Sequence, residues 1–211
     1  MLEELKEANE YIIGKIKEKD TLILEMESYA KEYNVPIVTK EVAEYLKFIV
    51  DMNKSTNILE IGTAIGYSGI LMAQIATKYN GKLVTIEIDE ERYNLAQENF
   101  KKSGLTNIKS ILGDATEEVK KLDEKFDFVF IDASKGHYME FFNDSYKLLK
   151  KDGIIFIDNI MFRGYLYKEY PKRFKTIVKR LDNFIDYLYE NYNFTLVPFG
   201  DGIGLLKKEE E

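Results

Sequence analysis

Residues 57–68 read Asn-Ile-Leu-Glu-Ile-Gly-Thr-Ala-Ile-Gly-Tyr-Ser, and this stretch decides the fold. Residues 58–61 have the apolar character of a buried strand, interrupted only by Glu60. Gly62 and Gly66 then predict a tight turn that leads into the first turn of a helix. A strand, a glycine turn and a helix in this order form the place where α/β folds bind a nucleotide-like ligand, because glycine permits close approach and the helix N-terminus offers free N–H groups.

Two residues of this turn restrict the ligand. The carboxylate of Glu60 disfavours a diphosphate and suits a cationic or hydroxyl-rich ligand. The Gly-x-Gly-x-x-Gly pattern of nicotinamide-dependent oxidoreductases needs a second glycine where Ala64 stands. The turn therefore predicts a nucleoside-like ligand and argues against a dinucleotide-dependent oxidoreductase.

Strands and helices alternate outward from this stretch. The predicted strands cover residues 58–61, 82–88, 108–112, 126–131 and 153–157, and the predicted helices between and after them cover 66–79, 90–102, 115–122 and 138–149. This alternation predicts an α/β fold with a doubly wound, mostly parallel sheet. A long amphipathic helix at 171–192 precedes two further strands, 194–198 and 203–206. The turn Gly200-Asp201-Gly202 is so short that these two strands must form an antiparallel hairpin.

The first 54 residues form a predicted helical preface. Apolar residues recur at helical spacing over residues 2–16 and 22–33, and a third helix starts at Thr39, after the break that Pro36 imposes. The preface either packs on the core or forms an oligomer contact. No linker or repeat is evident, so we expect residues 1–211 to form a single domain.

The composition excludes several classes of protein. The chain has 211 residues with a net charge of −7 and no cysteine, so a disulfide framework and a thiolate metal site are excluded. The acidic balance disfavours nucleic-acid binding by the whole surface, DNA included, but leaves room for a local basic patch. Without an apolar run near 18 residues or a signal-peptide core, we expect no membrane span and a cytoplasmic location.

Acidic residues follow two of the predicted strands at their carboxyl ends. Glu87 ends the second strand, where a carboxylate can accept both hydroxyl groups of a ribose, or it belongs to a helix-capping cluster with Asp89. Asp114 either contacts an adenine amino group or caps the following helix. For both residues, the sequence alone does not decide between a ligand contact and a role in helix capping.

A second polar group follows the fourth and fifth strands. Asp132, Asp158 and Asn159 offer hard oxygen ligands of the kind that Mg²⁺ or Ca²⁺ takes; otherwise they cap a helix and form a turn. Lys135 lies three residues after Asp132, and a lysine beside a divalent cation releases its proton more readily, so it is a candidate general base. Otherwise it is a solvated surface residue, and the lone His137 is more often incidental.

One segment is basic, although the chain as a whole has a negative net charge. Residues 168–180 contain six basic residues and one acidic residue, Glu169. The segment can bind phosphates, with nearby tyrosines for stacking, or it is the solvated face of a helix. The preceding residues 161–167 lack periodicity and are a candidate substrate-facing loop.

Three motifs together resemble the cation-dependent O-methyltransferases that use S-adenosylmethionine, the family of the catechol and caffeoyl-coenzyme-A enzymes. They are residues 59–68, residues 130–138 (Phe-Ile-Asp-Ala-Ser-Lys-Gly-His-Tyr) and Asp158-Asn159. The resemblance implies a Rossmann-like methyltransferase fold with a seven-stranded sheet, its core beginning at residue 55. Within this family, Val35-Pro36-Ile37, Phe162-Arg163-Gly164 and Gly200-Asp201-Gly202 resemble most the branch that methylates 5-hydroxyuridine in bacterial tRNA.

The resemblance also implies roles for individual residues. It makes Lys135 and Asp132 catalytic. It implies that the cation is held by Asp132, Asp158 and Asn159. The implied S-adenosylmethionine contacts are Val38, Glu60, Gly62, Tyr67, Ser68, Glu87, Ile88, Asp114, Ala115 and Asp132, and the implied tRNA contacts are Arg163, Lys172, Arg173, Lys175, Lys179 and Arg180.

The implied reaction is Mg²⁺-dependent methylation of the 5-hydroxyl of a wobble 5-hydroxyuridine in tRNA, which gives 5-methoxyuridine. The resemblance also implies that the enzyme is a homodimer. An enzyme with the same chemistry but a small catechol-like phenol as acceptor is the alternative. A non-catalytic RNA-binding module would not need the predicted metal ligands and Lys135. A divalent cation other than Mg²⁺ is also compatible with the oxygen ligands.

Overall fold

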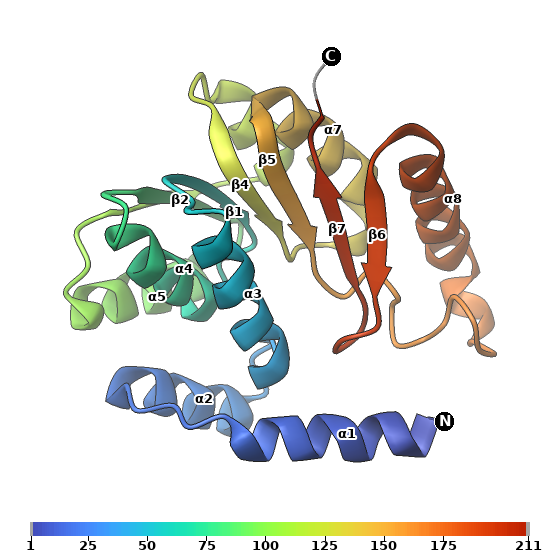
Figure 1. The fold of residues 1–211 in the computed structure, drawn as a ribbon, viewed down its shortest axis with the longest axis horizontal. Coiled ribbons are helices and arrows are strands. Elements are labelled where there is room, and N and C mark those ends of the chain that lie inside the picture. Colours follow the sequence, from blue (N-terminus) through green and yellow to red (C-terminus); the bar gives the residue numbers. More distant parts are fainter. Residues whose placement is uncertain (1, 210–211) are drawn as a thin grey trace.

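The computed structural model describes residues 2–209, with side chains from residue 7 onward. Within these residues, seven strands form one sheet in the order β3-β2-β1-β4-β5-β7-β6 (Figure 1). Strands β1 to β5 are parallel, and β7 pairs antiparallel with both β5 and β6. The predicted fold class, a mostly parallel sheet closed by an antiparallel hairpin, is confirmed.

The strands are β1 (Asn57–Ile61), β2 (Lys82–Glu87), β3 (Ile108–Leu112), β4 (Phe126–Ile131), β5 (Leu149–Ile157), β6 (Phe194–Val197) and β7 (Ile203–Lys207). The α-helices are α1 (Leu2–Lys15), α2 (Thr21–Tyr33), α3 (Lys40–Met52), α4 (Tyr67–Thr77), α5 (Glu90–Ser103), α6 (Ala115–Glu118), α7 (Tyr138–Leu148) and α8 (Lys175–Asn191). Short 3-10 helices are η1 (Val119–Lys121), η2 (Lys135–His137) and η3 (Lys172–Phe174).

Two boundaries differ most from the predictions. Strand β5 begins at Leu149, which pairs with Phe126 ahead of a bulge, but the exposed residues 150–152 that follow show no apolar pattern. The helix predicted from residue 171 begins at Lys175, after the tighter turn η3. The ring of Phe174, the last residue of η3, packs on Phe162 and Tyr165.

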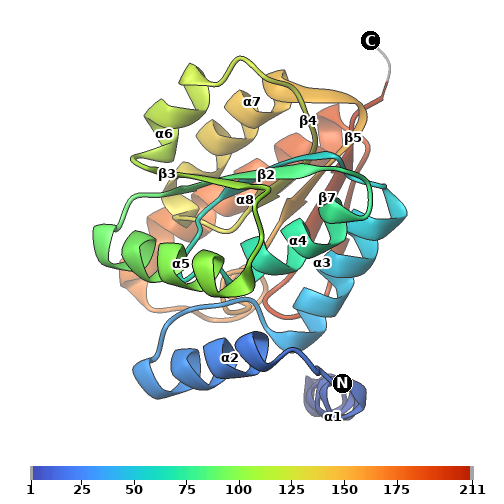
Figure 2. The ribbon, with the colours of Figure 1, turned by 90° about the vertical axis from the view of Figure 1, so that its left-hand side faces the viewer.

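Helices cover both faces of the sheet (Figure 2). Successive side chains of a strand point to opposite faces, so β1 contributes Ile58 to the cluster with α2–α5 and Leu59 to the cluster with α6–α8. All five residues of β1 are buried, as expected for a central parallel strand. This burial holds the carboxyl ends of the central strands in fixed positions.

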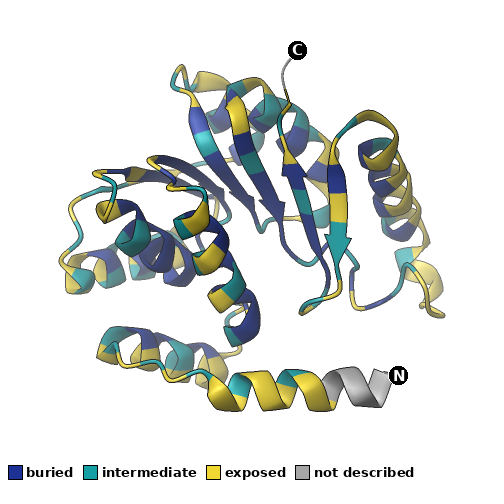
Figure 3. Cartoon of the chain, in the orientation of Figure 1, coloured by how far each residue is buried: buried dark blue, intermediate teal, exposed yellow. Residues whose placement is uncertain are grey.

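The helical preface divides into two parts. Helices α2 and α3 bury Ile23, Met26 and Leu46 in the core, so the core-packing interpretation is confirmed for them. In the described part of α1, from residue 7, no side chain is buried, and Tyr11 is 67% exposed (Figure 3). For α1 the oligomer-contact interpretation stays a prediction. None of the helices in the described chain is long and apolar enough to cross a bilayer.

Candidate active site

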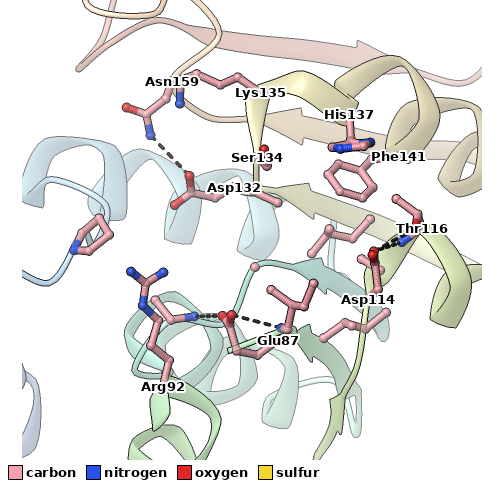
Figure 4. A pocket seen from close by; sticks show the side chains of 18 of the residues that line it. Glu87, Arg92, Asp114, Thr116, Asp132, Ser134, Lys135, His137, Phe141 and Asn159 are labelled. Carbon is pink, nitrogen blue, oxygen red and sulfur yellow. Dashed lines mark hydrogen bonds between the residues drawn. The ribbon is translucent and has the colours of Figure 1, made fainter. Parts of the chain in front are cut away.

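A cavity of about 750 Å³ opens at the carboxyl ends of the parallel strands (Figure 4). Backbone hydrogen bonds continue past the strands and align their ends: Gly62 N–H donates to Ile86 O, Asp132 N–H to Ile61 O, and Asp158 N–H to Ile131 O. Doubly wound sheets bind their ligands at this edge. We call this cavity the chamber.

The chamber brings together about half of the predicted site residues. Those that line it are Gly62, Glu87, Ile88, Asp114, Ala115, Asp132, Lys135, Asn159 and Arg163. The predicted residues outside its lining are Val38, Glu60, Tyr67, Ser68, Asp158, Lys172, Arg173, Lys175, Lys179 and Arg180. The roles assigned to both groups stay predictions, but the positions restrict what each residue can contact.

The glycine turn after β1 is packed directly on the end of β4. Gly62 has φ +98°, and a β-carbon there would overlap the carbonyl group of Asp132. Gly66 has φ +86°, with the ring of Phe100 where a β-carbon would lie. Both positions require glycine, because the left-handed backbone and the missing space exclude other residues. The turn therefore forms a fixed wall of the chamber.

Glu87 connects this wall to β2. One carboxylate oxygen accepts the N–H of Ala64 at 2.7 Å, and the other accepts the N–H groups of Ile88 and Asp89, each at 3.0 Å. Glu87 is buried apart from the part that lines the chamber. A carboxylate held by backbone donors keeps a fixed orientation, which suits acceptance of ribose hydroxyl groups.

Two of the carboxylates act as helix caps, one of the alternatives left open by the sequence. Asp89 accepts from Arg92 N–H at the start of α5, and Asp114 accepts from Thr116 N–H at the start of α6, both at 2.9 Å. The hydrogen bonds from Thr116 lower the pKa of Asp114. Asp114 remains at the chamber wall, so capping and a ligand contact are compatible there (Figure 4).

Glu60 lies below the chamber, in the core. It follows Ile58 by two residues and so points to the same face of the sheet, where it accepts from Ser68 Oγ of α4 at 2.5 Å and from Thr85 Oγ1 of β2 at 2.7 Å. Burial raises the pKa of Glu60 to about 8, against the effect of both hydrogen bonds. Neither Glu60 nor Ser68 lines the chamber, so the contacts predicted between these two residues and S-adenosylmethionine stay predictions.

The buried Glu60 predicts a pH-dependent stability. The ordinary pKa is 4.5, so the unfolded chain releases this proton at lower pH than the folded chain does. Stability is therefore lost as pH rises from about 4.5 to 8. Glu60→Gln removes this loss, and we expect it to raise the free energy of unfolding at pH 8 by on the order of 1–3 kcal/mol.

Thermal denaturation between pH 5 and 9 tests this expectation. The stability difference between Glu60→Gln and wild type should grow with pH and level off above pH 8. Glu98→Gln, at an exposed carboxylate of α5, serves as the control and should follow the wild type. Equal stabilities of Glu60→Gln and wild type at pH 8 would refute the argument.

Two of the predicted metal ligands, Asp132 and Asn159, lie together at the end of the chamber away from Glu87 (Figure 4). Asn159 Nδ2 lies 3.4 Å from Asp132 Oδ1, and Asp158 Oδ1 accepts Asn159 N–H at 2.7 Å. Burial raises the pKa of Asp132, and burial together with the Asp132 charge raises that of Asp158 to about 7. Two carboxylates that share a buried site in this way are stabilised by a cation.

The described carboxylate and imidazole side chains do not by themselves form a metal site. In the part of the chain that the structure describes, no three His, Cys, Asp or Glu side chains are grouped to hold a metal ion. The predicted set has two carboxylates and one amide, and rotation of the Asn159 amide would turn its oxygen toward Asp132. The residues fit a hard divalent cation by their chemistry, and the cation itself stays a proposal.

Lys135 belongs to the same end of the chamber. Its Nζ lies 5.9 Å from the ring centre of Tyr138 and 6.0 Å from that of Phe162, and its charge opposes the burial effect on Asp132. Tyr138 is buried, and His137 is exposed, with its Nδ1 3.4 Å from Glu140 Oε2. The lysine is thus a partly enclosed base candidate rather than a freely solvated side chain.

The basic segment lies outside the chamber. Lys172, Arg173 and Lys175 are exposed on η3 and at the start of α8. Arg180, one turn further along α8, lines a separate cavity of about 330 Å³ together with Lys135. These residues can contact only a ligand that extends beyond the chamber.

The structure adds chamber residues that the sequence did not predict. Arg92 of α5 lies near Glu87 and Phe141 lies beside His137 (Figure 4), and Asp201, in the turn between β6 and β7, also lines the chamber. Phe141 is buried in the core and also lines the chamber. Asp201 was named from the sequence only as part of the turn Gly200-Asp201-Gly202, and this motif was the signal from which its place at the site could have been predicted.

Comparison with known structures agrees with the observed fold. The structure of PaMTH1, a methyltransferase from Podospora anserina bound to S-adenosylhomocysteine, superposes with a TM-score of 0.87 at 23% identity, over 99% of this chain and 96% of that one. An O-methyltransferase from Bacillus cereus, also bound to S-adenosylhomocysteine, gives 0.83 at 24% identity, over 99% and 100%. The fold is therefore that of the Rossmann-like methyltransferases.

The sequence comparisons identify the family. A family model described as O-methyltransferase matches residues 17–209, and the chain belongs to this family. The catechol O-methyltransferase of Niastella koreensis is 32% identical over 166 residues, which cover 75% of each protein. The caffeoyl-CoA O-methyltransferase of Medicago sativa is 25% identical, over 83% of this chain and 76% of the relative.

Proposed function

We propose that the chain transfers the methyl group of S-adenosylmethionine to the 5-hydroxyl of 5-hydroxyuridine in tRNA, with Mg²⁺ or another divalent cation. The observation that carries the proposal is the division of one chamber into two ends (Figure 4). One end has the glycine turn and Glu87, which suit a nucleoside. The other has Asp132, Asn159 and Lys135, which suit an ionisable hydroxyl group.

The donor end suits S-adenosylmethionine in shape and charge. The glycine turn permits close approach of the methionine part, and Glu87 presents a fixed acceptor for the ribose. Carboxylates also suit a ligand that carries a sulfonium and an ammonium charge. Two proteins of known structure that share the fold of this chain were solved with S-adenosylhomocysteine bound, which supports the proposal.

The acceptor end suits a hydroxyl beside a second oxygen, as in 5-hydroxyuridine and in catechols. Asp132, Asp158 and Asn159 would hold the cation, which supplies positive charge that makes the acceptor hydroxyl more acidic. Lys135 removes the proton, and the acceptor oxygen then attacks the methyl carbon from the side opposite the sulfur. The rings of Tyr138 and Phe162 lie beside the Lys135 amine and restrict where it can move.

The basic segment favours tRNA over a small phenol. We expect reversal of Lys172, Arg173 and Lys175 to Glu to raise KM for tRNA roughly ten-fold or more, because phosphate contacts dominate affinity for nucleic acids. Since these residues lie outside the chamber, the rate with a catechol should not change. Methyl transfer from radiolabelled S-adenosylmethionine measures both rates.

Reversal of Lys101, Lys102 and Lys109 provides the control. Reversal of these exposed lysines of α5 and β3 gives the same change in net charge elsewhere on the surface, and the triple variant should keep wild-type activity on tRNA. Wild-type activity on tRNA of the variant with Lys172, Arg173 and Lys175 reversed would show that the basic segment does not bind tRNA. Nucleoside mass spectrometry of a deletion strain decides the substrate: 5-hydroxyuridine should accumulate and 5-methoxyuridine should be absent.

We also propose that the protein is a homodimer. The described part of α1 has no buried side chain, although Ile12, Ile13 and Ile16 repeat at helical spacing. Such a helix gains most of its stability from a partner surface. Light scattering of the purified protein tests the proposal, and a monomeric mass at micromolar concentration would exclude it.

A further inference from the structure

The loop that follows β5 has a strained backbone. Asn159, Phe162 and Arg163 have φ values of +57°, +46° and +59°, and Gly164 continues in the same left-handed region. Residues other than glycine rarely adopt this conformation, and bulky side chains adopt it least. Such a loop persists only where surrounding contacts hold it.

The turn between β6 and β7 supplies those contacts. Ile160 N–H donates to Gly202 O at 3.1 Å, and Met161 N–H donates to Asp201 O at 2.9 Å. In addition, Arg163 N–H donates to the carboxylate oxygen Oδ2 of Asp201 at 2.5 Å. The carboxylate of Asp201 therefore binds the backbone of a left-handed residue directly.

The turn that carries Asp201 is itself held firmly. The ring of Phe199 stacks on Tyr45 of α3, with 5.7 Å between the ring centres. A β-carbon at Gly200 would lie only 2.8 Å from Val42 Cγ2, so the turn packs closely on the same helix. Asp201 thus joins the loop to a rigid part of the core.

Both ends of the strained loop face the chamber. Asn159 and Arg163 line it, as does Asp201 itself. We infer that Asp201 is a positioning residue for the methyl acceptor: its carboxylate fixes the backbone at Arg163 and so presents Arg163 and Asn159 to the acceptor end of the chamber. The inference rests on the proposed function for the identity of the acceptor.

Kinetics of three variants test the inference. Asp201→Ala should raise KM for the acceptor about ten-fold, as expected for loss of a hydrogen bond to a charged group, with S-adenosylhomocysteine affinity within two-fold of wild type. Asp201→Asn retains an oxygen that can accept the Arg163 N–H, so it should restore most of the affinity. Asp123→Ala, at an exposed carboxylate before β4, is the control and should match the wild type.

Hydrogen exchange gives a readout that does not need turnover. Amides of residues 159–167 should exchange faster in Asp201→Ala than in wild type, Asp201→Asn or Asp123→Ala. Unchanged exchange and unchanged KM in Asp201→Ala would overturn the inference. Equal losses in Asp201→Asn and Asp201→Ala would also overturn it, because they would assign the effect to charge rather than to the hydrogen bond.

Two further outcomes separate the inference from the proposed function. If the wild type methylates neither tRNA nor a catechol, the proposed function fails, and the exchange data still judge the hydrogen bond. If Asp201→Ala does not fold, Asp201→Glu replaces it, since it keeps the charge but moves the carboxylate by one methylene. Its exchange should then be faster than that of wild type, and wild-type exchange would overturn the inference.

Discussion

Replacement of Lys135 by Met is expected to lower kcat roughly 10²- to 10⁴-fold, the usual contribution of a positioned proton acceptor. Methionine keeps the apolar part of the side chain between Tyr138 and Phe162 but has no amine. The donor end lies at the other side of the chamber, so affinity for S-adenosylhomocysteine should stay within two-fold of wild type (Figure 4). Single-turnover methyl transfer at saturating substrates measures the loss.

Lys135→Arg separates the two effects of the lysine. Arginine keeps a positive charge beside Asp132, where the Lys135 charge opposes the rise of the Asp132 pKa, but a guanidinium does not release its proton. If Lys135 removes the acceptor proton, both variants are slow. A near wild-type rate for Lys135→Arg would contradict the role as base and leave only an electrostatic role.

The fold could be predicted because its strongest signals are local. The apolar run of β1, the glycines after it and the short turn at residues 200–202 each restrict the backbone within a few residues. The start of β5 could not be predicted in this way. Its first pair with β4, Leu149 with Phe126, is separated from the apolar run at residues 153–157 by three exposed residues, and it depends on a partner strand about 20 residues away in the sequence.

Only part of the candidate site could be predicted, namely the part that follows from the rule that doubly wound sheets bind ligands at the carboxyl ends of their strands. That rule placed Glu87, Asp132 and Asn159 in one chamber, because parallel strands end at the same side of the sheet. It did not give the direction of Glu60, which follows from strand alternation: Glu60 shares the face of Ile58 and points into the core.

Asp201 was missed as a site residue for a different reason. It lies in the turn of the antiparallel hairpin formed by β6 and β7, and its contact with Arg163 joins residues 38 positions apart in the chain. No spacing within one element encodes such a contact. Residues of the basic segment were correctly recognised as a charge feature, but only the packing of α8 shows that they lie outside the chamber.

The glycine turn that decides the fold gives the second large prediction. Gly62→Ala is expected to lower the free energy of unfolding by about 3–5 kcal/mol and Tm by about 10 °C. Two costs add: an alanine must adopt φ +98°, and its β-carbon overlaps the carbonyl of Asp132, which the β4 backbone cannot move away. Calorimetric unfolding at pH 7 measures the change.

Gly104→Ala separates these two costs. Gly104, at the end of α5, has φ +69° but no atom within 4 Å of the position that a β-carbon would take. This variant should lose only about 1 kcal/mol, the cost of the left-handed backbone. If Gly62→Ala melts within 2 °C of Gly104→Ala, the turn and the end of β4 are not packed as described. If the larger loss is found, the wall of the chamber and the stability of the sheet depend on the same contact, because displacement of the Asp132 backbone disturbs both the donor turn and the acceptor carboxylate.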